Sequence, residues 1–380
     1  MLDKQIMFIC ADLDFFFSHR LSIARDVQAR GYAVHVAAPG ASSNPRVRQK
    51  GFYGHSLKIN AGGMNPLQEL ATALQIRRLI ARSKVKTVQA IGLKSILPTA
   101  LARRWNRQVV PIFLFTGLGY LFTGEASKLK AIRIALRPVL KTLFRNPRVI
   151  FVFQNKDDKQ EFLYRKYINS NQKTYIVPGS GVRTERFPKM PLPKNAGLHV
   201  LMPARVVGDK GAREFIEAAK IAKTARRDIH FAIAGAPDAK NPTCLSPDEI
   251  NAAKSFVTFL GHQSDMHALY TQADIVCLPS YREGLPKALL EAASTGRPLI
   301  AADAPGSREI VRDGVNGALV PVGDAKALAQ MILSLANNLD LREKYGQASA
   351  QIVRQDYAMP IINAQMIQIY EDAQAQTDEY

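Results

Sequence analysis

The sequence predicts an α/β protein made of two doubly wound, Rossmann-like domains. Short runs of β-branched and apolar residues alternate with helix-length amphipathic segments, and this series of strands and helices occurs twice. Runs that are apolar throughout are typical of parallel strands covered by helices on both faces. A chain of 380 residues is long enough to give each domain its own core.

The first series contains six expected strands, at 6–10, 33–38, 85–90, 109–115, 149–154 and 174–178. A segment with three prolines and little periodicity follows at 183–197, and we interpret it as the interdomain linker. The sequence therefore predicts an N-terminal domain over residues 1–185.

The second series also contains six expected strands, at 198–204, 229–235, 256–261, 275–280, 298–303 and 317–321. Only helical patterns follow them, at 324–336, 339–355 and 359–375. We expect the second domain over residues 195–355. Residues 356–380 are expected to form a C-terminal helix that returns towards the first domain.

Charge is distributed unevenly along the chain. The net charge is +19, but residues 1–190 hold 32 Lys and Arg against 10 Asp and Glu, whereas residues 191–380 hold 19 against 22. This asymmetry indicates an anionic partner for the first half, either nucleic acid or an anionic membrane surface.

The remaining composition indicates a cytoplasmic protein. No apolar run approaches the ~20 residues that span a bilayer, and the N-terminus has no signal-peptide pattern. The three cysteines, Cys10, Cys244 and Cys277, are scattered, which suits a reducing compartment and makes no metal-binding pattern.

A pair of cations follows the first strand of the second domain. Arg205 closes that strand, and Lys210-Gly211 opens the next helix. Because a lysine at a helix N-terminus opposes the helix dipole, a bound anion would explain its presence. Diphosphate fits, since Arg can bind two oxygens, Lys adds a point charge and Gly211 permits close approach. The alternative is a solvated basic loop.

Two carboxylates follow the strand at 275–280. Glu283 is expected at the carboxyl edge of the sheet, where open α/β folds bind ligands, and the backbone amides of residues 284–287 could hold phosphate oxygens. Glu291 lies in a helix rich in Leu and Ala, so its carboxylate needs a partner such as a ribose diol. The alternative is a helix-start acid with a structural ion pair.

These motifs resemble those of the retaining GT-B glycosyltransferases of family 4. "RVVGDKG" matches the R-x4-K-G element, and Glu283 with Glu291 matches the E-x7-E element. The resemblance covers essentially the whole chain. "AGAPDAKNPTC", "FLGHQSDMHALYTQADIVCLPSYREG" and "DGVNGALVP" are similar, in particular, to bacterial N-acetylgalactosaminyltransferases that extend undecaprenyl-diphosphate-linked glycans.

The resemblance implies a GT-B fold with two domains facing a central cleft, and a role for each matched residue. Arg205 and Lys210 would bind the donor diphosphate and stabilise the leaving group, and Glu283 would contact the donor sugar. Glu291 would hold the ribose. The other donor-binding residues would come from three turns and comprise Gly211, Gly261, His262, Gly284, Leu285, Pro286 and Lys287.

The same resemblance implies retaining transfer of a sugar, with UDP-GalNAc as the favoured donor and α linkage as the outcome. The acceptor would be a polyprenyl-diphosphate-linked glycan. No metal cofactor is expected, because Arg205 and Lys210 can stabilise the charge that develops on the leaving diphosphate.

The first domain offers candidate acceptor-binding residues after its first strand. "DLD" at 12–14 has the spacing of a metal-binding pair, but we favour Asp12, His19 and Arg20 as the acceptor side of the site. For His19, packing at a helix end is an equal alternative. "TGLGYLFTG" at 116–124 lacks a histidine that many family members have, and leaves Thr116 and Gly117 as further candidates.

A basic amphipathic helix is expected over 128–148. Lys130, Arg133, Arg137 and Lys141 recur at helical spacing beside an apolar stripe, and Pro138 could bend the helix. Such a helix can bind an anionic bilayer surface, so we expect the protein at the cytoplasmic face of the inner membrane. The alternative is a core-packed helix with a solvated basic face.

Three other functions would fit parts of the sequence. Nucleic-acid binding would explain the charge, but the sequence has no stacking motif, basic heptad or zinc module, so no nucleic-acid partner is expected. A GT-B nucleotide-sugar epimerase would need an acid/base set that no motif indicates. A non-enzymatic membrane scaffold would not need Arg205, Lys210, Glu283 and Glu291 together.

Overall fold

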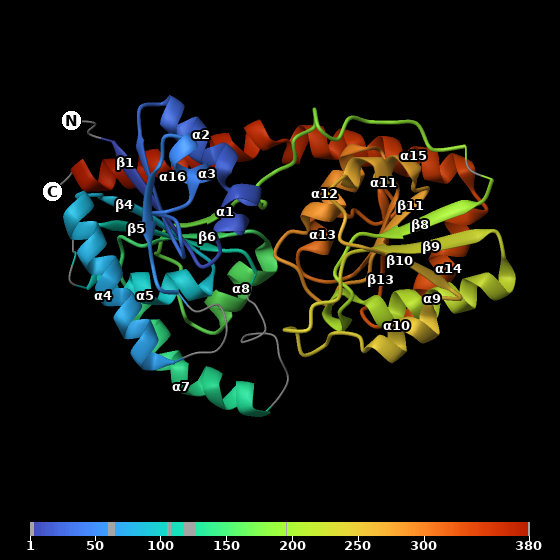
Figure 1. The fold of residues 1–380 in the computed structure, drawn as a ribbon, viewed down its shortest axis with the longest axis horizontal. Coiled ribbons are helices and arrows are strands. Elements are labelled where there is room, and N and C mark those ends of the chain that lie inside the picture. The colour runs from blue at the N-terminus through green and yellow to red at the C-terminus, as the bar shows by residue number, and fades with distance from the viewer. Residues whose placement is uncertain are drawn as a thin grey trace. The chain divides into compact units, whose positions relative to one another are not determined.

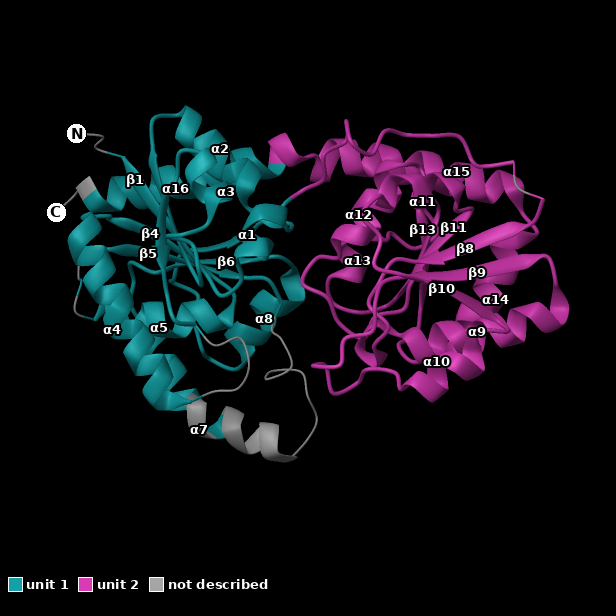
Figure 2. Cartoon of the chain, in the orientation of Figure 1, with its two compact units in different colours: residues 1–180, 362–380 teal, residues 181–361 magenta. Residues whose placement is uncertain are grey.

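The computed structural model describes residues 4–59, 65–104, 106, 108–117, 127–194 and 196–378, apart from the side chains of 127–133, 135, 136 and 378 (Figure 1). The chain divides into two compact units (Figure 2). Unit 1 comprises residues 1–180 and 362–380, and unit 2 comprises residues 181–361.

Unit 1 is built on a seven-stranded parallel sheet with the order β3-β2-β1-β4-β5-β6-β7. Its strands are β1 Gln5–Cys10, β2 Ala33–Ala38, β3 Tyr53–Ser56, β4 Thr87–Ile91, β5 Val110–Phe115, β6 Ile150–Phe153 and β7 Thr174–Ile176. Six of them lie where the apolar runs predict strands. The sequence did not indicate β3, because this strand, which pairs with β2 at the edge of the described sheet, has no apolar run.

Helices cover both faces of the unit 1 sheet. They are α1 Leu13–His19, α2 Leu21–Ala29, α3 Pro45–Gln49, α4 Pro66–Ser83, α5 Leu93–Arg103, α7 Ser127–Phe144, α8 Lys156–Tyr164 and α16 Met359–Asp378. In β1, Ile6 and Phe8 pack with Tyr370 of α16, whereas Met7 and Ile9 pack with α4 on the other face. This two-faced burial explains why the strands are apolar throughout.

Unit 2 repeats the plan with six parallel strands in the order β10-β9-β8-β11-β12-β13. The strands are β8 Leu198–Met202, β9 Ile229–Ala234, β10 Val257–Gly261, β11 Ile275–Leu278, β12 Leu299–Ala302 and β13 Gly317–Val320. The helices are η1 Gly208–Lys210, α9 Ala212–Ala225, α10 Pro247–Ala253, α11 Met266–Gln272, α12 Lys287–Ser294, α13 Ser307–Ile310, α14 Ala325–Ala336, α15 Leu339–Ile352 and η2 Val353–Tyr357. The predicted pair of doubly wound α/β domains is therefore confirmed.

The strand order of unit 2 fixes where a ligand is expected. β8 and β11 are hydrogen-bonded neighbours, and the chain winds outwards from them in opposite directions. In doubly wound sheets such a reversal opens a crevice at the carboxyl ends of the two strands. The segments that follow β8 and β11 are those that carry Arg205, Lys210 and Glu283.

The expected linker packs against unit 2. Arg297, with no exposed surface, donates hydrogen bonds to the carbonyl oxygens of Met190 (2.6 Å), Pro191 (2.7 Å) and Ala273 (3.1 Å). Ser294 Oγ donates to the carbonyl of Phe187 at 2.6 Å. These bonds tie the segment after residue 181 to the unit that holds the candidate site.

Candidate active site

The turn after β8 is held against the end of β11. Gly211 has φ +76°, and a Cβ at this position would lie 2.2 Å from the carbonyl oxygen of Pro279. Only glycine fits both the left-handed backbone and this close approach. The resulting contact brings Lys210, just before Gly211, beside the loop that carries Glu283.

Lys210 and Glu283 form an ion pair. Lys210 Nζ lies 2.5 Å from Glu283 Oε1, and their side chains are 23% and 12% exposed. The sequence predicted both residues for the site but not their contact. Glu283 therefore takes part in an ion pair, as the alternative interpretation expected, and this pair lies in the segment predicted to bind the donor.

The loop after β12 supports Glu283. The backbone N–H of Glu283 donates to the carbonyl of Pro305 at 3.0 Å. Gly306, with φ +82°, approaches so closely that a Cβ would lie 2.5 Å from the carbonyl oxygen of Glu283. Sequence reasoning missed these two residues, although "APG" directly after an expected strand is a turn signal at the same sheet edge.

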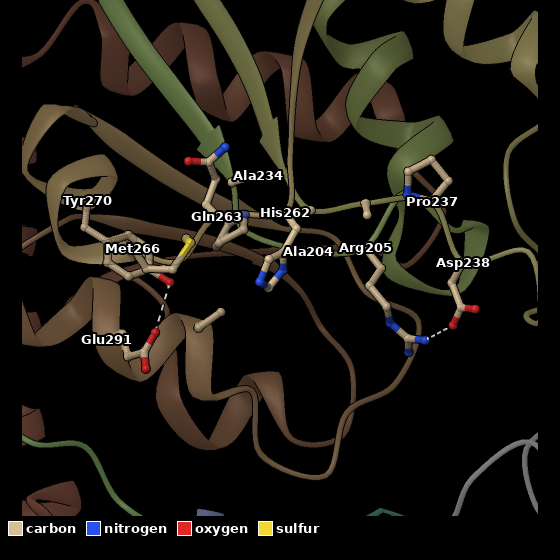
Figure 3. A pocket seen from close by; sticks show the side chains of 14 residues that line it. Ala204, Arg205, Ala234, Pro237, Asp238, His262, Gln263, Met266, Tyr270 and Glu291 are labelled. Atoms are coloured by element: carbon tan, nitrogen blue, oxygen red, sulfur yellow. Dashed lines mark hydrogen bonds and ion pairs between the residues drawn. The ribbon is translucent and has the colours of Figure 1, made fainter. Parts of the chain in front are cut away.

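A cavity of about 440 Å³ opens beside this edge (Figure 3). Three predicted residues, Arg205, His262 and Glu291, line it together. The other lining residues come from the ends of β8 and β9, the turn after β10, and helices α11 and α12: they are Pro203, Ala204, Ala234, Gly235, Ala236, Pro237, Asp238, Gln263, Met266, Tyr270 and Ala288. Its size is within the range of small-molecule sites.

Glu291 presents a carboxyl in a mostly apolar part of this cavity. Its side chain is 14% exposed; Tyr270 Oη lies 3.4 Å from Oε2 and Lys287 Nζ lies 3.8 Å from Oε1. Burial raises the pKa of Glu291, while the charges of Lys287, Arg186 and Arg183 and the Tyr270 hydroxyl act in the opposite direction. Burial likewise lowers the pKa of Lys287. Because both contacts are long, Glu291 can accept further hydrogen bonds, as vicinal hydroxyls would supply.

Arg205 lines the cavity from the segment that follows β8. Its side chain is 53% exposed and forms an ion pair with Asp238, from the loop after β9 (Figure 3). Sequence reasoning did not single out Asp238, because the contact joins loops that follow two different strands. A bound anion would compete with Asp238 for this guanidinium.

The turn from Gly284 to Lys287 leads into α12. Pro286 is the N-cap, with φ −74°, and its carbonyl accepts from the backbone N–H of Leu289 at 3.0 Å. Proline has no N–H, so the expected amide contact from Pro286 is wrong: in this turn only Gly284, Leu285 and Lys287 carry a backbone N–H.

The turn after β10 contributes His262 to the cavity. Gly261 ends the strand with φ +67°, and a Cβ there would have nothing within 4 Å. Glycine is therefore favoured here by the backbone conformation alone. Gln263 Nε2 donates to the carbonyl of Leu260 at 2.6 Å, which closes the turn.

The candidate acceptor residues lie in unit 1. Asp12 caps α1 by accepting from the backbone N–H of Asp14 at 2.8 Å, and the His19 ring stacks on Phe15 with centroids 4.2 Å apart. Arg20 is only 1% exposed; it donates to the carbonyl of Gly179 at 3.4 Å, and burial lowers its pKa to about 10. The expectation that Arg20 lines an acceptor surface is therefore wrong, because its side chain packs into the core.

The other two acceptor-binding candidates of unit 1 are the last described residues of the segment after β5. Thr116 and Gly117 follow β5 and are half-buried, and residues 118–126 of the same loop lie outside the described residues. In the "DLD" segment, Asp14 forms an ion pair with Arg46 at 2.8 Å.

Helix α7 forms at the place predicted for the basic amphipathic helix and contains Pro138. Leu140 and Phe144 are buried, so this part of α7 packs on the core. Arg137 is exposed. Desolvation lowers the pKa of Lys141, and the positive charges of Arg137, Lys166 and Arg145 lower it further. The side chains of Lys130 and Arg133 lie outside the described set. In the described part of the chain, no helix is long and apolar enough to cross a membrane.

Two family models match the chain. "Glycosyl transferase 4-like" matches residues 6–155, and "Glycosyl transferases group 1" matches residues 183–352. The chain is a glycosyltransferase with the GT-B fold. The predicted assignment to family 4 and the prediction of a hexosyltransferase are confirmed, and retention of anomeric configuration stays a prediction.

Curated relatives and solved structures agree with this assignment. The chain is 26% identical, over 93% of its length and 95% of the relative, to the N,N'-diacetylbacillosaminyl-diphospho-undecaprenol alpha-1,3-N-acetylgalactosaminyltransferase of Campylobacter jejuni. It is 22% identical, over 72% of each chain, to the UDP-Gal:alpha-D-GlcNAc-diphosphoundecaprenol alpha-1,3-galactosyltransferase of Escherichia coli. Its fold matches Anabaena Alr3699/HepE in complex with UDP and glucose with a TM-score of 0.74, at 18% identity, over 96% of this chain and 99% of that one.

Proposed function

We propose that this glycosyltransferase retains anomeric configuration and transfers an N-acetylhexosamine, GalNAc from UDP-GalNAc being the favoured case, in α linkage to a polyprenyl-diphosphate-linked glycan. The pathway would be cell-surface glycan synthesis or protein glycosylation. Relatives from C. jejuni and E. coli are named for transfer to undecaprenyl-diphosphate glycans, which supports the acceptor class. A structural neighbour bound to UDP and glucose supports the donor class.

The observation that carries the donor proposal is the arrangement at the carboxyl edge of the unit 2 sheet. Arg205 and Glu291 line one cavity, and Lys210 follows in the turn from Arg205. Uridine would occupy the cavity near His262, the ribose hydroxyls would donate to Glu291, and the diphosphate would meet the two cations.

The chemistry follows from this arrangement. As the bond between the sugar and the diphosphate breaks, negative charge grows on the diphosphate, and Arg205 and Lys210 stabilise it. Glu283, beside Lys210, would accept hydrogen bonds from the donor sugar's hydroxyls. The acceptor hydroxyl would attack the anomeric carbon on the face from which the diphosphate departs and give its proton to the leaving diphosphate oxygen, so no dedicated protein base is needed. Because Arg205 and Lys210 stabilise the leaving charge, we propose neither a metal nor another cofactor.

Unit 1 would bring the enzyme to its lipid-linked acceptor. Arg137 and Lys141 of α7 lie among like charges that an anionic bilayer would offset. Each basic residue near such a surface contributes ~1 kcal/mol, so a few suffice for peripheral binding. We therefore place the enzyme at the cytoplasmic face of the inner membrane.

A screen followed by a transfer assay tests this proposal. Purified protein is first screened against nucleotide sugars by thermal shift, because a ligand that binds the native state raises apparent stability. The best donor is then incubated with a polyprenyl-diphosphate glycan, with and without EDTA, and the product linkage is determined by NMR. We expect an α-linked product, formed at the same rate with and without EDTA. A β-linked product, or activity lost in EDTA and restored by Mn²⁺, would contradict the mechanism.

A further inference from the structure

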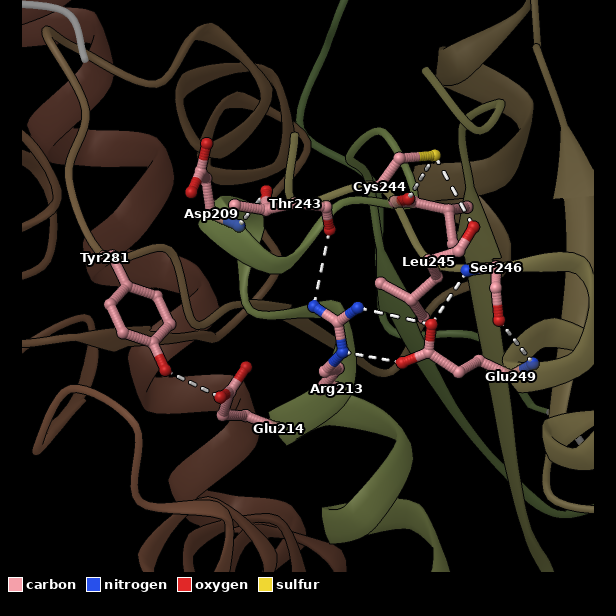
Figure 4. Close-up of polar contacts among 10 residues, drawn as sticks. Asp209, Arg213, Glu214, Thr243, Cys244, Leu245, Ser246, Glu249 and Tyr281 are labelled. Carbon is pink, nitrogen blue, oxygen red and sulfur yellow. Dashed lines mark hydrogen bonds and ion pairs between the residues drawn. The ribbon is translucent and has the colours of Figure 1, made fainter. Parts of the chain in front are cut away.

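The loop between β9 and α10 lines the donor cavity with residues 235–238, and its remaining residues have no role in the donor chemistry. It contains the "PDAKNPTC" segment at 237–244, and it lies against the turn that carries Arg205 and Lys210 (Figure 4). One antiparallel bridge, between Val207 and Cys244, joins them through two backbone hydrogen bonds. The N–H of Gly208 donates to the carbonyl of Thr243 at 2.8 Å, and the N–H of Leu245 donates to the carbonyl of Val206 at 3.3 Å.

Thr243 holds the residue next to Lys210. Its Oγ1 accepts from the backbone N–H of Asp209 at 3.1 Å and donates to Asn241 Oδ1 at 2.8 Å. Asn241 Oδ1 also accepts from the backbone N–H of Thr243 at 2.8 Å, and its Nδ2 donates to Asp209 Oδ2 at 3.2 Å. Asn241 and Thr243 therefore bind both the backbone and the side chain of Asp209.

A second set of bonds fixes Thr243 itself. Arg213, in the first turn of α9, donates to the carbonyl of Thr243 at 3.3 Å and to both carboxylate oxygens of Glu249, at 2.7 and 3.3 Å. Glu249 in turn closes a capping box with Ser246 at the start of α10. The loop is thus anchored to the helix that begins directly after the Lys210 turn.

The opposite side of the turn is held as well. The carbonyl of Asp209 accepts from the backbone N–H of Tyr281 at 3.0 Å, and Gly211 packs on Pro279. Asp209 is therefore fixed between the β9–α10 loop and the segment after β11, with Lys210 next in sequence.

We infer that Thr243 and Asn241 are positioning residues for sugar transfer, which set the place of Lys210 by fixing Asp209. This inference rests on the proposed function, since it assigns Lys210 to the leaving diphosphate. The physical reason is geometric: a displacement of ~1 Å in a catalytic group costs roughly 100-fold in rate. Loss of the Thr243 hydroxyl would also leave the Asp209 N–H without its acceptor.

Thr243→Val removes the hydroxyl at nearly constant shape, and Thr243→Ser keeps it. Asn241→Asp replaces the donor to Asp209 by a carboxylate oxygen, which repels the Asp209 carboxylate. We expect kcat to fall about tenfold or more in Thr243→Val and Asn241→Asp, with the donor KM within about threefold, and Thr243→Ser to stay within about threefold in kcat. Thr224→Val is the control, because among the described residues its hydroxyl bonds the carbonyl of Ile221, in its own helix, at 2.7 Å.

Hydrogen exchange at the Asp209 amide gives a readout that needs no substrate. We expect exchange at least about fivefold faster in Thr243→Val than in the wild type, and no change in Thr224→Val. If exchange accelerates while kcat is unchanged, or if Thr243→Ser loses as much kcat as Thr243→Val, the positioning role is wrong. If the wild type transfers no sugar, the proposed function fails, and the exchange result still decides whether Thr243 holds the turn.

Discussion

Replacing Lys210 by Met removes one of the two cations assigned to the leaving diphosphate while keeping the length of the side chain. Loss of one charged donor aimed at developing negative charge costs roughly 2.7–4 kcal/mol, or about 100- to 1,000-fold in kcat. We expect a loss of this size, measured as initial rates at saturating UDP-sugar.

The same substitution breaks the ion pair with Glu283, so its effect on stability can be separated from catalysis. Exposed pairs contribute about 0.2–1 kcal/mol, and breaking a buried pair costs about 3–5 kcal/mol. The side chains of Lys210 and Glu283 are 23% and 12% exposed, which places this pair between those limits. We expect a coupling of about 2 kcal/mol in the free energy of unfolding, from a double-mutant cycle of Lys210→Met and Glu283→Gln.

A matched pair on α9 provides the control. Lys220 Nζ lies 3.1 Å from Glu217 Oε2, and both side chains are about half exposed, at 44% and 52%. The cycle of Lys220→Met and Glu217→Gln should show coupling below about 0.5 kcal/mol and full transfer activity. The reasoning is refuted if Lys210→Met keeps kcat within about threefold, or if the two cycles give the same coupling energy.

Three further predictions follow from the contacts and pKa values of single residues. Burial raises the pKa of Glu291, so its ionised form lowers folding stability above the ordinary pKa of 4.5. In urea unfolding, Glu291→Gln should therefore be at least as stable as the wild type at pH 7 and should lose this advantage below pH 4.5. The variant should also bind UDP more weakly, as measured by calorimetry. Hydrogen bonding from Arg213 lowers the pKa of Glu249 to about 2, so this carboxylate contributes folding stability that is complete above pH 4.5 and lost as the pH falls through 2. The difference in urea midpoint between the wild type and Glu249→Gln should therefore shrink at low pH. A constant difference from pH 7 to pH 2 would contradict this expectation. Arg137→Gln with Lys141→Gln should weaken sedimentation with anionic vesicles at low salt, while Lys254→Gln with Lys223→Gln, in unit 2, should not.

The fold could be predicted because strands buried on both faces are apolar throughout. The run from Ile6 to Cys10 shows the principle, since its alternate residues pack on opposite helical layers. The prediction missed β3, where an edge position leaves Tyr53 55% exposed and removes the apolar signal. Arg20 was misjudged because a charged residue in a helix junction gives no sequence sign of burial.

The site could be predicted in part. Strand-end position indicated Arg205, a carboxylate in a helix rich in Leu and Ala indicated Glu291, and the family resemblance indicated His262. All three line one cavity. The partners of these residues were not foreseen, because Asp238 and Tyr270 approach them from other strands and helices, and such long-range contacts depend on the order of strands in the sheet. The pairing of Lys210 with Glu283 likewise requires β8 and β11 to be neighbours, which no local pattern specifies.

The central claim is that Arg205 and Lys210 recognise the donor diphosphate at the carboxyl edge of the unit 2 sheet. Calorimetric titration with UDP and with UMP, in the wild type and in the double variant Arg205→Gln with Lys210→Met, tests it most directly. Because hydrogen bonds to charged groups contribute about 1.5–3 kcal/mol each, we predict that the wild type binds UDP at least about tenfold more tightly than UMP. In the double variant this ratio should fall to within about twofold, and an unchanged ratio would contradict the account.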